Sequence, residues 1–302
     1  MKRSRLKRSS PTYSAASDRV VDTILTILAL LMIAVCLYPF IYMLSLSVSD
    51  AVSVTKGEVH LLPKGLNFNA YKQLLKHPDL MRSFLNTLFY TIVGTAWSMF
   101  MTTLAAYALA KRDLPGKRFF NFFIVFTMIF SAGLIPTFLV VNKLGLYNTR
   151  AAIILVGAFS PWNLIVLRTY MQSLPVSLKE SARIDGASEF YIFRKIYLPL
   201  SKPAVATIML FYAVARWNDY FHALVYLIDT DKMPVQMIIR GLVITMNDAL
   251  GSTIAVSGNA IAYSPQSFRA AVIIVTMLPI LCLYPFIQKY FTKGMMVGSV
   301  KG

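Results

Sequence analysis

The side chains that most often perform chemistry in proteins are few and scattered in this sequence. The three histidines, His60, His77 and His222, lie far apart and do not form the H-x-x-x-H spacing of a metal site. Neither G-x-x-x-x-G-K-[ST] nor G-x-S-x-G is present, so no nucleotide-binding loop or serine nucleophile of these kinds is predicted. Asp229 and Asp231 lack the further ligands of a calcium loop. The sequence therefore predicts no metal, no cofactor and no enzymatic reaction in this chain.

Long apolar stretches surround these residues and indicate the class of protein. Of the 302 residues, 57% are hydrophobic and only 14% are charged, whereas about 25% of the residues in a soluble domain are charged. Both cysteines, Cys36 and Cys282, lie inside apolar stretches, which argues against a structural disulfide. The composition predicts a membrane protein with several spans.

Six apolar stretches are candidates for crossing a bilayer, which takes about 20 helical residues. They are residues 24–48, 83–110, 119–142, 151–167, 203–228 and 270–288. The fourth stretch is short and contains Pro161, which we expect to kink its helix. The first stretch is too long for the apolar core of a signal peptide, so we expect it to be retained. We predict an all-α domain of six transmembrane helices over residues 20–302, preceded by a disordered basic tail over residues 1–19.

The positions of lysine and arginine predict the orientation of this domain. Most of the 30 basic residues fall in segments that would share one side with the N-terminus. These segments are residues 1–19, 111–118, 168–202 and 289–302. Because short cytoplasmic loops are enriched in basic residues, we place both termini in the cytoplasm. The net charge of +17 follows from this bias and does not require nucleic acid as a partner.

Residues 177–203, here named the inner polar segment, carry a cluster of charges between two apolar stretches. Ser177 and Glu180 fit a capping box, S-x-x-E, which predicts the start of a short helix. We expect this helix to end near Asp185, where Gly186 permits a reversal of the chain. A second short helix would then end at Leu198-Pro199. It carries the apolar residues Phe190, Ile192, Phe193 and Ile196, which either pack on the inner ends of the bundle or fill a groove in another protein.

The spacing within the inner polar segment resembles the EAA loop of ABC importer permeases, E-A-A-x3-G-x9-I-x-L-P. Glu180-Ser181-Ala182, Gly186 and Ile196-Tyr197-Leu198-Pro199 occupy its fixed positions, and only Ser181 departs from the pattern. The resemblance implies that short coupling helices dock on a separate ATPase dimer, which binds the ATP and Mg. The residues it assigns to this coupling are Glu180, Ser181, Ala182, Asp185, Gly186, Ile196, Leu198 and Pro199.

Two further stretches resemble the carbohydrate branch of these permeases, in particular its smaller, maltose-type partner. Residues 216–221, RWNDYF, are similar to its W-N-x-[FY] signature, and residues 294–302 are similar to its C-terminal tail. The resemblance implies contacts of Gly298, Lys301 and Gly302 with the ATPase. It also implies a bacterial plasma (inner) membrane, a heterodimer with a second permease and an extracytoplasmic solute-binding protein. The function that it implies is import of an oligosaccharide by alternating access. The long outer loop, residues 229–269, corresponds to a loop that enters the binding protein; otherwise it packs over the bundle.

Four residues in the fifth stretch are candidates for a translocation pathway. Trp217, Asn218 and Tyr220 could line a sugar route, or they could pack between helices. Arg216 would be costly inside a membrane, so we expect it to pair with Asp219 or to attract an anionic, uronate-containing sugar. An importer of another solute and a secondary transporter remain as alternatives. The second has less support, because no internal repeat is evident.

Overall fold

A computed structural model of the chain describes residues 15–76, 78–248 and 263–295. These residues are mainly helical and contain no β-strand, only an isolated bridge between Ser49 and Leu66. The predicted all-α class is therefore confirmed. The chain divides into two compact units, residues 1–70 with 258–271 and residues 71–257 with 272–302.

The first unit is built on α1 (Ala15–Val48) and α2 (Ala51–Thr55). The Asp50 carboxylate caps α2 by accepting hydrogen bonds from the amides of Val52 and Ser53 at 2.9 and 3.0 Å. The apolar side chains of α1 are exposed along most of its length, as expected of a helix that contacts lipid or a partner. Because α1 begins at Ala15, the predicted end of the tail at residue 19 is wrong, and residues 1–14 lie outside the described residues.

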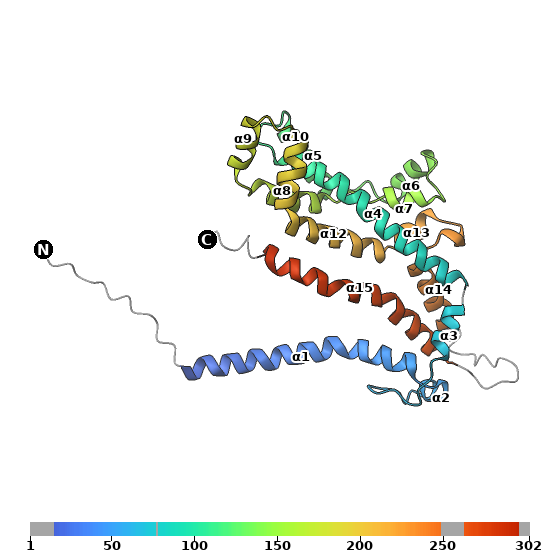
Figure 1. Ribbon diagram of the computed structural model, residues 1–302. Coiled ribbons are helices and arrows are strands. Elements are labelled where there is room, and N and C mark those ends of the chain that lie inside the picture. The colour runs from blue at the N-terminus through green and yellow to red at the C-terminus, as the bar shows by residue number, and fades with distance from the viewer. Residues whose placement is uncertain (1–14, 77, 249–262, 296–302) are drawn as a thin grey trace. The chain divides into compact units, whose positions relative to one another are not determined.

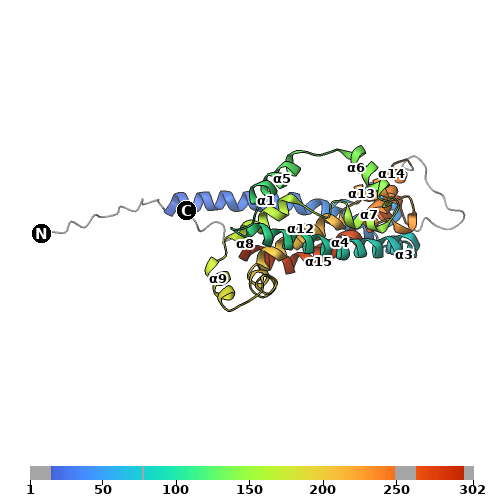
Figure 2. The ribbon, with the colours of Figure 1, turned by 90° about the horizontal axis from the view of Figure 1, so that it is seen from above.

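The second unit is organised around α4 (Pro78–Ala110), along which α8 (Pro161–Gln172) and α12 (Lys202–Trp217) pack. Figures 1 and 2 place α9 and α10 at the C-terminal end of α4, and α7, α13 and α14 toward its other end. The remaining helices are α3 (Asn69–Lys76), α5 (Lys117–Ile129), α6 (Leu134–Lys143), α7 (Arg150–Leu155), α9 (Val176–Ile184), α10 (Glu189–Ile192), α11 (Leu198–Leu200), α13 (Phe221–Tyr226), α14 (Val235–Asp248) and α15 (Pro265–Met295).

Among the described residues, three helices are long and apolar enough to cross a membrane: Arg19–Val48, Asp79–Ala110 and Pro265–Cys282. Two bent pairs raise the number to at most five. Lys117–Ile129 and Leu134–Lys143 meet at 115°, and Glu189–Leu200 and Lys202–Trp217 meet at 82°. We place the first half of the second pair outside the membrane because it carries several charges. The six-span count thus stays a prediction.

The fourth and fifth predicted spans are not continuous helices. Residues 151–167 are divided between α7 and α8. Pro161 is the first residue of α8, a position where proline sacrifices no hydrogen bond, so the predicted kink inside a helix is wrong. In the fifth stretch α12 ends at Trp217, so Arg216 lies in the last turn of that helix.

The outer loop packs on α4 over the part of it that the structure describes. The Asn86 side-chain amide donates to the carbonyls of Asp231 and Met233 at 2.8 and 3.2 Å. The Tyr90 hydroxyl donates to the Lys232 carbonyl at 2.8 Å. These bonds support the expectation that the loop packs over the bundle. Residues 249–262 lie outside the described residues.

Tyr212 joins three helices of the second unit through its buried hydroxyl. The hydroxyl lies 2.8 Å from Thr102 Oγ1 on α4 and accepts a hydrogen bond from the Ser160 amide, at the start of α8, at 3.0 Å. Tyr212→Phe leaves these buried groups without a partner, so we expect the free energy of unfolding to fall by about 1–3 kcal/mol. Thermal unfolding in detergent measures this change. Tyr170→Phe on α8 is the control, and an equal loss in both variants would contradict the assigned role.

Candidate functional site

The first helix of the inner polar segment is α9. It begins at Val176, directly after Pro175, and no side chain caps it. The predicted capping box is therefore wrong: Ser177 lies within the first turn of α9, because Pro175 with its fixed φ starts the helix instead. The predicted end is confirmed, since Asp185 is the C-cap and Gly186 follows with a φ of +76°. The Gly186 and Ala187 amides donate to carbonyls of the last turn at 3.0 and 2.9 Å, which is a Schellman motif.

The second helix continues further than predicted. Ser188 caps α10 by accepting a hydrogen bond from the Tyr191 amide at 3.2 Å, and a π-helical turn, Phe193–Tyr197, leads into α11. The predicted stop at Leu198-Pro199 is confirmed to within one residue, because the helix ends at Leu200 and then bends by 82°. The π turn resets the hydrogen-bond register and places Pro199 near the start of α11, where its missing N–H is tolerated.

The side chains of the inner polar segment separate into a packed set and an exposed set. Ile192 is fully buried, Phe193 is 9% exposed, and Ala182, Ile196 and Leu198 pack against the same core cluster. The exposed set, here named the docking face, combines polar groups with large apolar ones. It consists of Glu180, Ser181, Ile184, Asp185, Phe190 and Tyr191. Packing on the bundle is therefore confirmed for Ile192, Phe193 and Ile196, while insertion of the exposed Phe190 into another protein stays a prediction.

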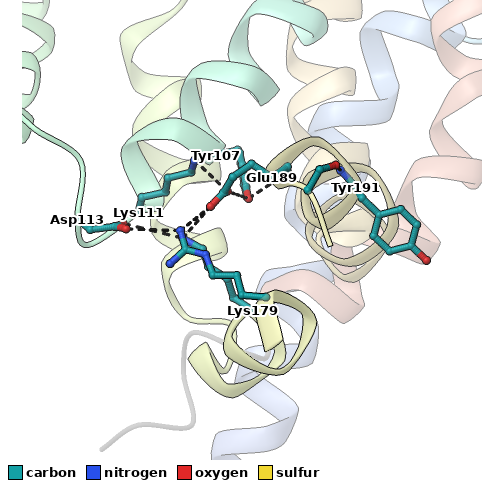
Figure 3. Close-up of polar contacts among 8 residues, drawn as sticks. Tyr107, Lys111, Asp113, Lys179, Glu189 and Tyr191 are labelled. Carbon is teal, nitrogen blue, oxygen red and sulfur yellow. Dashed lines mark hydrogen bonds and ion pairs between the residues drawn. The ribbon is translucent and has the colours of Figure 1, made fainter. Parts of the chain in front are cut away.

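The Glu189 carboxylate ties this segment to the end of α4 (Figure 3). It accepts a hydrogen bond from the Tyr107 hydroxyl at 2.6 Å and lies 2.9 Å from the Lys111 ammonium. The Arg183 guanidinium of α9 donates to its other oxygen at 2.5 Å. Burial by itself raises the pKa of the Glu189 carboxyl, but these three hydrogen bonds outweigh that effect and lower its pKa to about 2. Glu189 is therefore ionised in the folded protein at neutral pH.

A second carboxylate, Asp113 in the turn between α4 and α5, extends this cluster. It lies 3.5 Å from Arg183 and 3.9 Å from the Lys179 ammonium, which is also 3.8 Å from Glu189. Hydrogen bonding to its own backbone and the charge of Lys179 lower the pKa of the Asp113 carboxyl. Together these side chains hold α9 and α10 against the C-terminal end of α4.

The sequence reasoning did not identify Glu189, although a signal was present. An acid directly after the N-cap Ser188 is favoured at a helix start, and Lys179 and Arg183 precede it on α9. The contribution of Tyr107 and Lys111 could not be read from the sequence, because they lie about 80 residues away from Glu189. Only the fold brings them together.

The Glu189 cluster gives a pH-dependent prediction. A carboxyl with a folded-state pKa below its unfolded value stabilises the fold above the unfolded value, about 4.3–4.5. This contribution is lost as the pH falls toward 2. We expect Glu189→Gln to lower the melting temperature by a constant amount above pH 5, and by progressively less below pH 4.5. Thermal unfolding across pH measures the difference. Glu180→Gln on the exposed docking face serves as the control, and a pH-independent difference for Glu189→Gln would contradict the prediction.

Arg216 occupies the break between α7 and α8. Its guanidinium donates to the carbonyls of Ile153, Ile154 and Val156 at 2.5, 3.0 and 3.1 Å, and so caps the C-terminal end of α7. Its distance to Asp219 is 3.9 Å, and the carboxylate of Asp219 lies closer, 2.7 Å, to Nδ1 of His222. The sequence predicted that Arg216 pairs with Asp219 or attracts an anionic sugar. Neither prediction included these carbonyls, which are its nearest partners.

The other candidate pathway residues lie in different environments. Trp217 is buried, and its indole donates to the Thr276 carbonyl at 3.1 Å while its ring packs edge-on against Phe84. Asn218 and Tyr220 are exposed. Trp217 therefore packs between helices. The Asn218 amide donates to the Val214 carbonyl at 3.0 Å and the Arg240 guanidinium lies 5.5 Å from the centre of the Tyr220 ring, so their place in a sugar route stays a prediction. The predicted tail contacts, Gly298, Lys301 and Gly302, lie outside the described residues.

Comparisons with known proteins identify the family of this chain. Residues 101–297 match the family described as binding-protein-dependent transport system inner membrane component. The chain belongs to this family. In *Bacillus subtilis* (strain 168), the polygalacturonan/rhamnogalacturonan transport system permease protein YtcP is 42% identical over 285 residues, covering 94% of this chain and 99% of YtcP. Protein LplC from the same strain is 44% identical over 269 residues, covering 89% of this chain and 90% of LplC.

A solved structure agrees with the family match. A chain from a bacterial ABC transporter involved in the import of the acidic polysaccharide alginate superposes with a TM-score of 0.84 and 38% identity. The match covers 93% of this chain and 100% of that chain. The predicted resemblance to ABC importer permeases of the carbohydrate branch is confirmed. The chain is a transport subunit of the inner membrane, while the side on which each terminus lies stays a prediction.

Proposed function

We propose that this chain is the permease subunit of an ATP-driven importer that carries an anionic, uronate-containing oligosaccharide into the cell. The observation that carries the proposal is the similarity to two proteins over more than nine-tenths of the chain. One is named for polygalacturonan and rhamnogalacturonan and the other imports the acidic polysaccharide alginate. All three polymers contain uronic acids, so a carboxylate-bearing sugar is the substrate class they share.

The assembly we propose has four kinds of component. This chain pairs with a second permease, and a separate ATPase dimer binds ATP and Mg on the cytoplasmic side. A solute-binding protein delivers the oligosaccharide on the outer side, as the family's description as binding-protein-dependent suggests. The described outer loop and the inner polar segment lie toward opposite ends of α4, which supports a six-span topology with cytoplasmic termini.

In this assembly the docking face contacts the ATPase. Closure of the ATPase dimer on ATP moves α9 and α10 together, because the Schellman motif at Gly186 and the Glu189 carboxylate fix their geometry. Since Glu189 and Asp113 join this unit to the inner end of α4, the movement reaches the helix on which α8 and α12 pack. Alternating access then follows from the displacement of these helices against the partner permease.

The substrate class is tested by uptake into proteoliposomes that contain the complete importer and its binding protein. We expect ATP-dependent uptake of tetragalacturonate, with maltotetraose taken up at less than about a tenth of that rate. Methyl-esterified tetragalacturonate, which keeps the size and removes the charge, is the matched control. Uptake of maltotetraose at the same rate as tetragalacturonate would contradict the anionic substrate.

Arg216→Gln distinguishes the two roles of this residue. Because the guanidinium is bonded to backbone carbonyls of α7, we expect uptake of tetragalacturonate and of its methyl ester to fall by the same factor. The amount of protein in the membrane is measured alongside. A loss confined to the charged substrate would instead show that Arg216 attracts the sugar carboxylates.

Gly186→Asp tests the coupling role of the inner polar segment. Gly186 has a φ of +76°, so a side chain there strains the turn between α9 and α10. We expect the variant to reach the membrane and the ATPase to hydrolyse ATP with uptake reduced at least tenfold. Gly145→Asp is the matched control, since Gly145 has a φ of +69° and, like Gly186, has open space around it. Normal coupled uptake in Gly186→Asp would refute the role.

A further inference from the structure

A cavity of about 500 Å³ opens beside the Glu189 cluster, between the turn that follows α4, the end of α8 and one side of α9. We name it the inner basic pocket. Five cationic side chains line it: Lys111, Arg112, Lys117, Lys179 and Arg183. The only carboxylates among the lining residues are those of Asp113 and Glu180. Even when Glu189 is added, cations outnumber carboxylates, so the pocket has an excess of positive charge.

Lys179 is the most unusual member of the pocket. It is only 8% exposed, yet the nearest carboxylate oxygens to its ammonium lie at 3.8 and 3.9 Å. Both distances exceed that of a hydrogen bond, and no other partner is found for the ammonium within the part of the chain that the structure describes. An ammonium has three donors, and Lys179 lines the cavity, so its ammonium can reach an acceptor there. The pocket therefore leaves room for an acceptor that its own carboxylates do not supply.

We infer that the inner basic pocket binds a phosphate-bearing anion. A phosphate group offers several charged acceptor oxygens in a small volume, which suits a buried ammonium with guanidinium groups beside it. A cavity of 500 Å³ also lies within the usual range for small-molecule sites, roughly 300–1,000 Å³. A sugar carboxylate is disfavoured as the ligand, because the pocket lies at the inner end of α4, opposite the outer loop.

The phosphate has two possible sources, and the position of the pocket favours one. The pocket is formed directly after the apolar helix Asp79–Ala110 and before α5. If that helix crosses the bilayer, the pocket lies at the level of lipid headgroups. The cytoplasmic leaflet carries anionic phospholipids, and basic pockets next to helix ends bind their headgroups. An anionic phospholipid is therefore the expected source, and free phosphate is the other. This assignment rests on the cytoplasmic orientation proposed above.

Binding there would influence coupling. A phosphate held by Lys179 of α9 and Arg112 of the α4–α5 turn would add a link between the inner polar segment and α4, beside the one made by Glu189. The anion would thus stiffen the contact that transmits the movement of the ATPase.

The test is calorimetric titration of the complete importer in detergent with three probes: dihexanoyl-phosphatidylglycerol, dihexanoyl-phosphatidylcholine and inorganic phosphate. We expect phosphatidylglycerol to bind, and its affinity to fall about tenfold in Lys179→Gln and in Arg112→Gln, since each removes a charge-assisted contact. Arg194→Gln, an exposed cation of the same segment outside the pocket, should leave the affinity unchanged. Arg112 is exposed and lies outside the Glu189 cluster, so we expect Arg112→Gln to fold normally. A loss of affinity in this variant therefore cannot come from misfolding.

Each outcome decides the inference. Binding of phosphatidylglycerol alone, lost in both pocket variants, identifies a lipid site, and tighter binding of inorganic phosphate with the same losses identifies a site for the free anion. Equal affinity in wild type and both pocket variants overturns the inference. So does binding that occurs only after the ATPase is removed, because the pocket would then be occupied by the ATPase. None of these results depends on the transported sugar, so a failure here leaves the proposed substrate intact.

Discussion

The need to satisfy every backbone group of a broken helix governs the interior of this protein. A bilayer offers no water to an exposed carbonyl or amide, so a helix that ends inside the membrane requires partners from its own protein. The break between α7 and α8, which interrupts the predicted fourth span, meets this requirement from both sides. The Arg216 guanidinium donates to carbonyls at the C-terminal end of α7, and the Tyr212 hydroxyl accepts a hydrogen bond from the Ser160 amide before α8. Both side chains come from α12, so that helix holds the break in place against α4.

A second set of contacts fixes the inner end of the bundle, and it is electrostatic. Glu189 and Asp113 are each shared by cations from α9, and Glu189 also by Lys111 at the end of α4. Ion pairs at a surface usually contribute little. Here the contribution of the ion pairs is geometric. One carboxylate with three hydrogen-bonded partners on α4 and α9 restricts how these two helices can lie relative to each other. In the proposed assembly, these contacts would keep the docking face in place as the ATPase moves.

The two sets of contacts explain how the family's function fits this chain. The inner end offers a stiff, partly apolar surface to a partner, and the helix breaks lie further along α4, near the described part of the outer loop. Asn218 and Tyr220 are exposed at the end of α12, whereas Trp217 is used for packing. The same short signature, RWNDYF, thus divides its residues between stabilising the helices and lying exposed at the end of α12.

The sequence alone determined the class and the family, and it predicts the sidedness. The length of the apolar stretches and the positions of the basic residues can be read directly from the chain. The spacing of the fixed residues from Glu180 to Pro199 is likewise a property of the sequence and does not depend on the fold. It also located the turn at Gly186, because only a local backbone preference was needed. The tertiary structure decided where helices break, that Pro161 starts a helix and does not kink one, and that Pro199 lies inside a longer helix. It also decided the partners of Arg216 and Glu189. Those depend on residues some 60 to 80 positions away, and no local pattern encodes which distant carbonyl or cation will be near.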